Sequence, residues 1–188
     1  VKATLVSGQL SRQYSIPIRA SAPNASNCVD AQAAYETQMS LWACILGHIN
    51  LVNHSCGWLE GGLSCSFDKM IVDAEMIQMM IENLKPLVIN EDTLGLSAIE
   101  EVGPGGHFFG AAHTIERYET AFYSPFLSDW RNYESWTEAG SLNATERATI
   151  IWKEMLENFE PPAMDPVIKQ GIDEFVDRRK SEILGSAS

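Results

Sequence analysis

The 188-residue sequence lacks several features that would each assign it to a familiar class. No apolar run approaches the ~18 to 20 residues that a membrane-spanning helix needs. Only four cysteines are present, none in a Cys-x-x-Cys pair, which excludes a disulfide framework. Basic residues form no stripe with interleaved aromatics, so nucleic acid is not an expected partner. These absences predict a cytoplasmic protein with reduced thiols and no membrane contact.

The first residues also lack the parts of a signal peptide. Val-Lys-Ala-Thr-Leu-Val-Ser-Gly has no charged n-region, no apolar h-region and no starting Met. This start predicts that the sequence is cut from a longer protein. What is present, 45% hydrophobic and 20% charged residues, suits one domain with a substantial core.

The net charge of −12 is unevenly distributed along the chain. Residues 1–60 hold three basic and three acidic residues, whereas residues 61–188 hold ten basic and 22 acidic ones. The acidic surface of the later segments has two interpretations, a solvated face or a docking face for a partner protein.

Hydrophobic periodicity and capping residues predict an alternation of helices and short strands. We expect helices at 3–14, from Asp30 to Gly47, from Ser66 or Asp68 to Pro86, and around 96–101. Apolar runs at 16–20 and 49–53 predict strands. Later segments are expected to be a helix capped by Thr114, an irregular and well-packed aromatic excursion over 122–143, and helices at 144–158 and 165–183.

This alternation predicts an α/β fold with parallel strands and crossover helices. A complete (β/α)₈ barrel typically takes about 250 residues. We therefore predict the helix-rich C-terminal part of a TIM barrel over residues 1–143, which carries the active-site loops. Residues 144–188 would form a helical tail packed on the barrel. A small, self-contained α/β domain is the alternative.

The candidate site residues lie in two glycine-containing blocks, which hold or adjoin all four histidines. The first, residues 48–63, carries His54, Cys56, Trp58 and Glu60 after an expected strand. Glu60 beside Trp58 suits a bound cation, because a carboxylate and an aromatic face both attract positive charge; a plain loop carboxylate is the alternative. His54, Cys56 and Cys65 are also spaced for a zinc site, a further alternative to small buried thiols.

The second block, residues 103–114, presents His107 and His113 around a glycine turn. Their functional interpretation is substrate hydrogen bonding or proton transfer, and the alternative is that they hold a loop in place. The Gly103-x-Gly-Gly turn lacks a Walker lysine and the full Gly-x-Gly-x-x-Gly pattern, so phosphate binding is not expected.

Four motifs in order give the chain a family resemblance. They are Asp30-Ala-Gln-Ala-Ala-Tyr-Glu36, Gly57-Trp-Leu-Glu-Gly-Gly-Leu63-Ser, Asp68-Lys…Asp73-Ala-Glu75, and Gly103-Pro-Gly-Gly-His-Phe-Phe109…His113-Thr. Together they resemble the C-terminal part of the trimethylamine methyltransferase family, over nearly the whole chain. The resemblance implies a TIM-barrel enzyme that moves a methyl group from a methylated amine to a separate corrinoid protein. The cobalamin would be carried by that partner, with no cofactor or metal bound directly.

The sequence departs from the family pattern at one position. Archaeal trimethylamine enzymes have pyrrolysine at a position that corresponds to Gly61 here. Glycine at this position resembles instead the members that demethylate quaternary amines such as glycine betaine. The resemblance then implies that Glu60 and Trp58 lie near the cation and that His107 and His113 contact a polar group. Gly61, His54, Phe108 and Phe109 would line the pocket, and self-association is expected.

A non-catalytic α/β binding or scaffold domain remains the rival hypothesis. It predicts that the aromatic excursion over 122–143 is exposed. It also predicts that His54, Glu60 and His107 do not converge.

Overall fold

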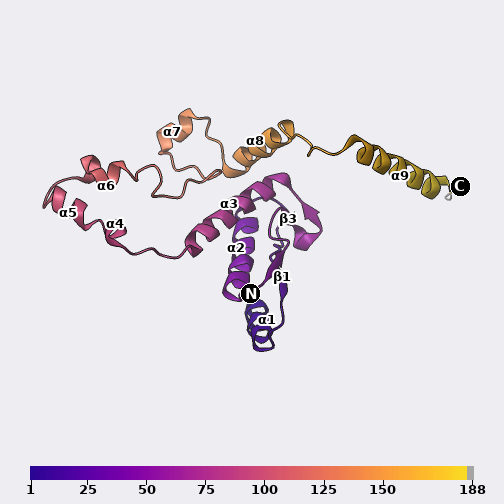
Figure 1. Ribbon diagram of the computed structural model, residues 1–188, viewed down its shortest axis with the longest axis horizontal. Coiled ribbons are helices and arrows are strands. Elements are labelled where there is room, and N and C mark those ends of the chain that lie inside the picture. Colours follow the sequence, from indigo (N-terminus) through magenta and orange to yellow (C-terminus); the bar gives the residue numbers. More distant parts are fainter. Residues whose placement is uncertain (186–188) are drawn as a thin grey trace. The chain divides into compact units, whose positions relative to one another are not determined.

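Residues 1–185 are described by a computed structural model, in which the chain divides into a unit from Val1 to Glu154 and a second unit that begins at Met155 (Figure 1). The first unit is helix-rich, with short strands. The predicted boundary between residues 143 and 144 lies inside this unit and stays a prediction.

A parallel strand pair joined by a helix organises the first unit. Strand β1 (Arg19–Ser21) pairs with β2 (Leu51–Asn53), so that Arg19 faces Leu51 and Ser21 faces Asn53, and helix α2 (Ala31–Leu46) connects them. This is the predicted β-α-β order. Both strands begin later than the apolar runs suggested, because the Asn50 side chain accepts a hydrogen bond from the Ile18 amide at 2.9 Å before the ladder starts.

Helix α2 begins and ends where the sequence predicts. The Asp30 side chain accepts a hydrogen bond from the Ala33 amide at 3.0 Å, and Gly47 follows the last turn. Helix α1 (Lys2–Gln13), also predicted, packs against α2. The approach is close: a Cβ on Gly8 would lie 2.2 Å from the Gly47 carbonyl oxygen. Only glycine allows the two backbones to meet there.

Helix α3 (Phe67–Leu84) starts at the predicted Ser66 cap, whose side chain accepts from the Lys69 amide, and ends just before Pro86. Its methionines Met76 and Met80 pack with Leu41 and Ala22 in one buried cluster. A second cluster joins Ile71 of α3 to Leu127 and to Ala148 of helix α8 (Ala144–Glu157). Helix α3 therefore links both cores of the unit.

The α3–α8 contact is polar at its edge. Asp68 accepts hydrogen bonds from Thr149 Oγ1 at 2.5 Å and from Trp152 Nε1 at 2.7 Å. Partial burial acts to raise the pKa of Asp68, but the bonds from Thr149 and Trp152 outweigh it and hold this pKa below its usual value. The ionised carboxylate is thus the form that joins the helices.

Replacing Asp68 by Ala is expected to lower the free energy of unfolding by about 1–2 kcal/mol, since two donors lose a charged acceptor. Because the folded pKa is depressed, the contribution of Asp68 is present above the unfolded pKa and is lost as the pH falls through the folded one. Urea unfolding of wild type and D68A from pH 7 downward measures this difference. A constant gap at every pH contradicts the assignment, and D68N provides the uncharged control.

Between α3 and α8 the chain is built from short helices: α4 (Glu91–Leu94), α5 (Leu96–Val102), η2 (Phe108–Gly110), α6 (Ala112–Ile115) and α7 (Tyr133–Glu138). The prediction that Thr114 caps a helix is wrong. Helix α6 begins after Ala111, which is buried and provides no side-chain cap, and Thr114 lies inside the helix.

The aromatic excursion over 122–143 is less packed than predicted. Phe122 is 76% exposed and Trp130 69%, whereas Leu127 is buried. The polar anchor of this segment is Glu75 of α3, whose buried carboxylate accepts from the Phe126 and Leu127 amides at 3.0 Å and from Tyr123 Oη at 3.2 Å. A carboxylate with several donors, rather than aromatic packing, thus holds the segment.

The second unit contains helix α9 (Pro166–Gly185), close to the predicted 165–183. Its side chains are exposed along its whole length. Across residues 1–185, no helix has both the length and the apolar character required to cross a bilayer.

Candidate functional site

Two loops meet where the parallel strands end. We call residues 22–29, which follow β1, the first loop and residues 54–65, which follow β2, the second loop. The Glu60 amide donates to the Ser26 carbonyl at 2.9 Å and the Gly61 amide to the Asn24 carbonyl at 2.7 Å. The carboxyl ends of parallel strands are where α/β proteins place their binding sites, so this junction is the candidate site.

The second loop folds as a small hairpin that the sequence analysis missed. Strands β3 (Trp58–Leu59) and β4 (Ser64–Cys65) pair antiparallel around the turn η1 (Glu60–Gly62). The sequence feature that indicates the hairpin is the Gly61-Gly62 pair between two short segments, since such pairs supply the positive φ that tight turns need. Gly61 and Gly62 have φ values of 64° and 100°.

His54 and Trp58 lie together at the base of this hairpin. His54 Nδ1 is 3.1 Å from the hydroxyl of Ser21, the last residue of β1, which joins the ends of both strands. Its ring stands edge-on to Trp58, with centroids 5.1 Å apart and planes at 86°. The structure therefore brings two predicted site residues into contact.

The tip of the hairpin carries the predicted cation partner. Glu60 is exposed and has a φ of 50°, and His54 has one of 55°, in the region that residues with a Cβ rarely adopt. A Cβ on Gly61 would meet nothing within 4 Å, so the tip borders open space.

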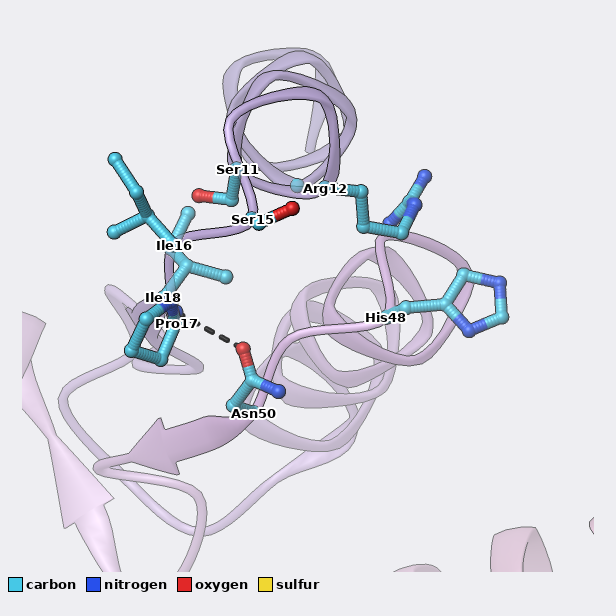
Figure 2. Close-up of a pocket in the computed structure, with 9 residues that line it drawn as sticks. Ser11, Arg12, Ser15, Ile16, Pro17, Ile18, His48 and Asn50 are labelled. Carbon is cyan, nitrogen blue, oxygen red and sulfur yellow. Dashed lines mark hydrogen bonds between the residues drawn. The ribbon is translucent and has the colours of Figure 1, made fainter.

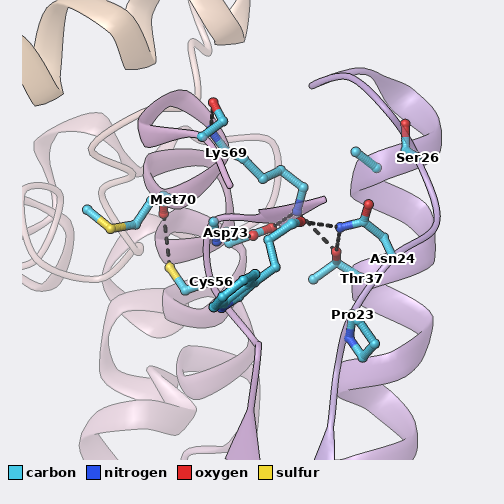
Figure 3. Close-up of polar contacts among 12 residues, drawn as sticks. Pro23, Asn24, Ser26, Thr37, Cys56, Lys69, Met70 and Asp73 are labelled. Atoms are coloured by element: carbon cyan, nitrogen blue, oxygen red, sulfur yellow. Dashed lines mark hydrogen bonds and ion pairs between the residues drawn. The ribbon is translucent and has the colours of Figure 1, made fainter. Parts of the chain in front are cut away.

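A buried polar cluster contacts the second loop (Figure 3). We call Asn24, Thr37, Lys69 and Asp73 the buried cluster. Lys69 pairs with Asp73 and donates to Thr37 Oγ1 at 3.0 Å, which also accepts from Asn24 Nδ2 at 3.1 Å. The cluster was not predicted. The sequence feature that could have indicated it is the helical stripe formed by Lys69, Asp73, Met76 and Met80. Two charged residues occupy core positions in this stripe.

Burial raises the pKa of Asp73, and the hydrogen bond and charge of Lys69, with the Gly57 amide, oppose that rise. Burial also raises the pKa of Cys56, whose thiol donates to the Met70 carbonyl at 3.1 Å. A neutral thiol turned toward a backbone carbonyl is a poor metal ligand. Within residues 1–185 no three His, Cys, Asp or Glu side chains are grouped to hold a metal, so the zinc hypothesis gains no support.

The predicted residues of the second block lie apart from the hairpin. His113 Nε2 donates to the Asp92 carbonyl at 2.8 Å, and Arg117 pairs with Asp92 and donates to the His113 carbonyl. His113 thus holds α4 against α6. His107 is exposed and lies 5.6 Å, between ring centroids, from Phe109.

Phe108 and Phe109 are also exposed. Over the described range 1–185, no hydrogen bond or ring contact joins residues 107–113 to the second loop. The structure therefore brings His54 and Trp58 into contact in the second loop, which also carries Glu60 and Gly61. The roles of these residues and of His107, Phe108, Phe109 and His113 stay predictions.

A separate pocket of about 440 Å³ opens at the other end of the strands (Figure 2). Its lining includes Arg12, Ile18, His48 and Asn50, which lie before the strands begin. None of the predicted site residues lines it. This pocket lies at the strand ends opposite the candidate site.

A β-α-β unit with polar and aromatic side chains just beyond its strand ends is an arrangement in which α/β proteins commonly place binding sites. The chain belongs to the trimethylamine methyltransferase (MTTB) family, whose model matches residues 1–184.

The names of the similar relatives state two activities, glycine betaine methyltransferase and trimethylamine methyltransferase. The chain is 38% identical over 178 residues to a glycine betaine methyltransferase of Desulfitobacterium hafniense, covering 94% of this chain and 37% of that protein. It is 29% identical over 157 residues to the trimethylamine methyltransferase MttB of the same species, covering 84% and 31%. Identity to MttB2 of Methanosarcina mazei is 26% over 151 residues, covering 79% and 30%. The chain spans about a third of the length of these relatives.

Proposed function

We propose that the protein to which this chain belongs transfers a methyl group from a quaternary methylated amine, of the glycine betaine type, to a corrinoid carried by a separate protein. The observation that carries the proposal is the 38% identity to a glycine betaine methyltransferase over 94% of the chain. A second support is Gly61 at the hairpin tip, the position that the family resemblance gives to pyrrolysine in the trimethylamine enzymes.

The chemistry explains why the substrate class matters. In the transfer, the bond between nitrogen and the methyl carbon breaks, and its electron pair stays on nitrogen. The methyl group is taken up by the reduced cobalt of the acceptor, which supplies the pair for the new bond. A quaternary amine has a permanent positive charge and leaves as a neutral tertiary amine, so no added electrophile is needed. The chain's part is to hold the cation in line with the acceptor.

The residues of the second loop suit such a cation. A trimethylammonium group has no N–H to donate, so it is recognised by aromatic faces and by negative charge rather than by hydrogen bonds. We assign Trp58 and Glu60 to the cation, with Gly61 leaving room at the tip and His54 supporting the Trp58 ring. His107 and His113 are assigned to a polar group such as a betaine carboxylate, and Phe108 and Phe109 to the wall of the pocket.

The direct test is a cob(I)alamin methylation assay on the full-length protein with trimethylamine, glycine betaine, carnitine and proline betaine. At least one quaternary amine is expected to be demethylated, and trimethylamine is expected to give no methylation above background. Turnover of trimethylamine alone contradicts the proposed substrate class. Absence of turnover with all four amines contradicts the proposed activity.

Replacing His107 by Ala in the full-length protein is expected to lower kcat/KM for a carboxylate-bearing amine about 10- to 100-fold, since one hydrogen bond to a charged group contributes about 1.5–3 kcal/mol. His48→Ala is the matched control, because His48 is also exposed but lines the pocket at the opposite strand ends. Corrinoid methylation rates show the difference. A near-normal kcat/KM in H107A shows that His107 is not part of the site.

A non-catalytic scaffold is the second candidate. Two observations favour it: Phe122 and Trp130 are exposed, and His107 does not contact the second loop within the described chain. The same four-amine assay separates the two functions, because a scaffold methylates nothing with any of them. Self-association, predicted from the sequence, is measured on the same preparation by sedimentation.

A further inference from the structure

The buried cluster contacts the second loop at two backbone groups that bracket Trp58. Asp73 Oδ2 accepts a hydrogen bond from the Gly57 amide at 2.9 Å, and Asn24 Nδ2 donates to the Trp58 carbonyl at 2.7 Å. The first contact is made by the residue before Trp58 and the second by the carbonyl of Trp58 itself. Together they fix where the indole ring leaves the backbone.

Thr37 is the junction of this network. Its hydroxyl oxygen accepts from Asn24 of the first loop and from Lys69 of α3, while Thr37 itself belongs to α2 (Figure 3). One oxygen atom of α2 therefore joins the first loop to α3, and Asn24 and Asp73 extend the network to the second loop. Thr37 is 1% exposed and Lys69 0%, so water does not compete for these bonds.

The energetics indicate a role other than stability. A buried ion pair is often no more stabilising than apolar side chains of the same size. Asn24 donates through its amide group to two partners, Thr37 Oγ1 and the Trp58 carbonyl. The polar groups of the cluster therefore fix the geometry of the loop rather than add stability that apolar side chains would not supply.

We infer that the buried cluster is a positioning device: Asn24, Thr37, Lys69 and Asp73 set the place of Trp58 at the carboxyl ends of the strands and thereby orient the bound amine. This inference rests on the proposed function for its substrate. Trp58 and Glu60 are carried on one hairpin, so a displaced hairpin still attracts a cation. It presents that cation at another angle, and amines of different shape are affected differently.

The first test needs no substrate. Thr37→Val deletes the junction hydroxyl at nearly constant shape, and Thr37→Ser keeps it. Hydrogen exchange of the full-length protein is expected to speed up at least tenfold at the Gly57, Glu60 and Gly61 amides in T37V, with α1 unchanged. T37S is expected to match wild type. Equal acceleration throughout the chain, or unchanged exchange at these amides, overturns the inference.

The second test separates positioning from loss of folded enzyme. The ratio of kcat/KM between glycine betaine and carnitine does not depend on the amount of active protein. T37V is expected to change this ratio at least threefold and T37S to leave it unchanged. A constant ratio in T37V assigns the cluster to structure alone. A wild-type enzyme inactive with every amine rejects the proposed function, and the exchange experiment still decides the positioning role.

If T37V does not fold, the double variant K69M/D73L replaces the ion pair by apolar side chains that need no partners. It removes the acceptor of the Gly57 amide directly. Faster exchange confined to the second loop supports the positioning role, and wild-type exchange at Gly57 refutes it.

Discussion

Lys69→Met is expected to lower the free energy of unfolding by about 3–5 kcal/mol, because it leaves the buried Asp73 carboxylate without its counter-charge. Lys69 and Asp73 are 0% and 1% exposed, so water does not replace the lost ammonium. Methionine fills the space of the lysine stem but supplies neither its charge nor its hydrogen bond to Thr37 Oγ1. Guanidinium unfolding of wild type and K69M at pH 7 measures the effect.

The double variant K69M/D73N is the matched control. The D73N side chain is neutral and keeps an oxygen that accepts from the Gly57 amide, so the double variant is expected to regain most of the lost stability. K69M should also recover partly at lower pH. Burial already raises the pKa of Asp73, and without Lys69 it rises further, so the folded state holds a proton that the unfolded state releases as the pH increases. A K69M deficit that is equal at pH 7 and pH 5 contradicts this account.

Local signals in the sequence predicted the frame of the first unit. Asp30, Ser66 and Pro86 mark helix boundaries because caps and proline act through the nearest few residues. The β-α-β order followed from the alternation of strand-like and helix-like hydrophobic patterns. The structure pairs β1 with β2 in parallel. The barrel that the resemblance implies stays a proposal, since the structure shows a helix-rich unit with few strands.

The candidate site was predicted only in part, for a physical reason. Trp58, His54 and Glu60 are neighbours in sequence, so their proximity needed only a short loop. The contacts of Asp73 with Gly57 and of Asn24 with Thr37 join residues that are distant in sequence, and periodicity gives no register for them. The helical period alone places the charged residues Lys69 and Asp73 on an apolar stripe. It does not indicate which groups their side chains bind.

The clearest functional consequence concerns Trp58. Replacing it by Ala in the full-length protein is expected to lower kcat/KM for a quaternary amine about 30-fold, because a desolvated cation–aromatic contact contributes about 2 kcal/mol and each 1.4 kcal/mol corresponds to tenfold. Trp58→Phe retains a smaller aromatic face and is expected to lose only about threefold. Cob(I)alamin methylation at subsaturating amine gives the three values.

Trp130→Ala is the control for loss of a large aromatic side chain, since Trp130 is 69% exposed and lies outside the second loop. It is expected to keep wild-type activity. If kcat/KM falls in the order wild type, W58F, W58A, the loss is caused by removal of the aromatic face. Equal losses in W58A and W58F point to the shape of the indole instead, and wild-type activity in W58A moves the cation elsewhere.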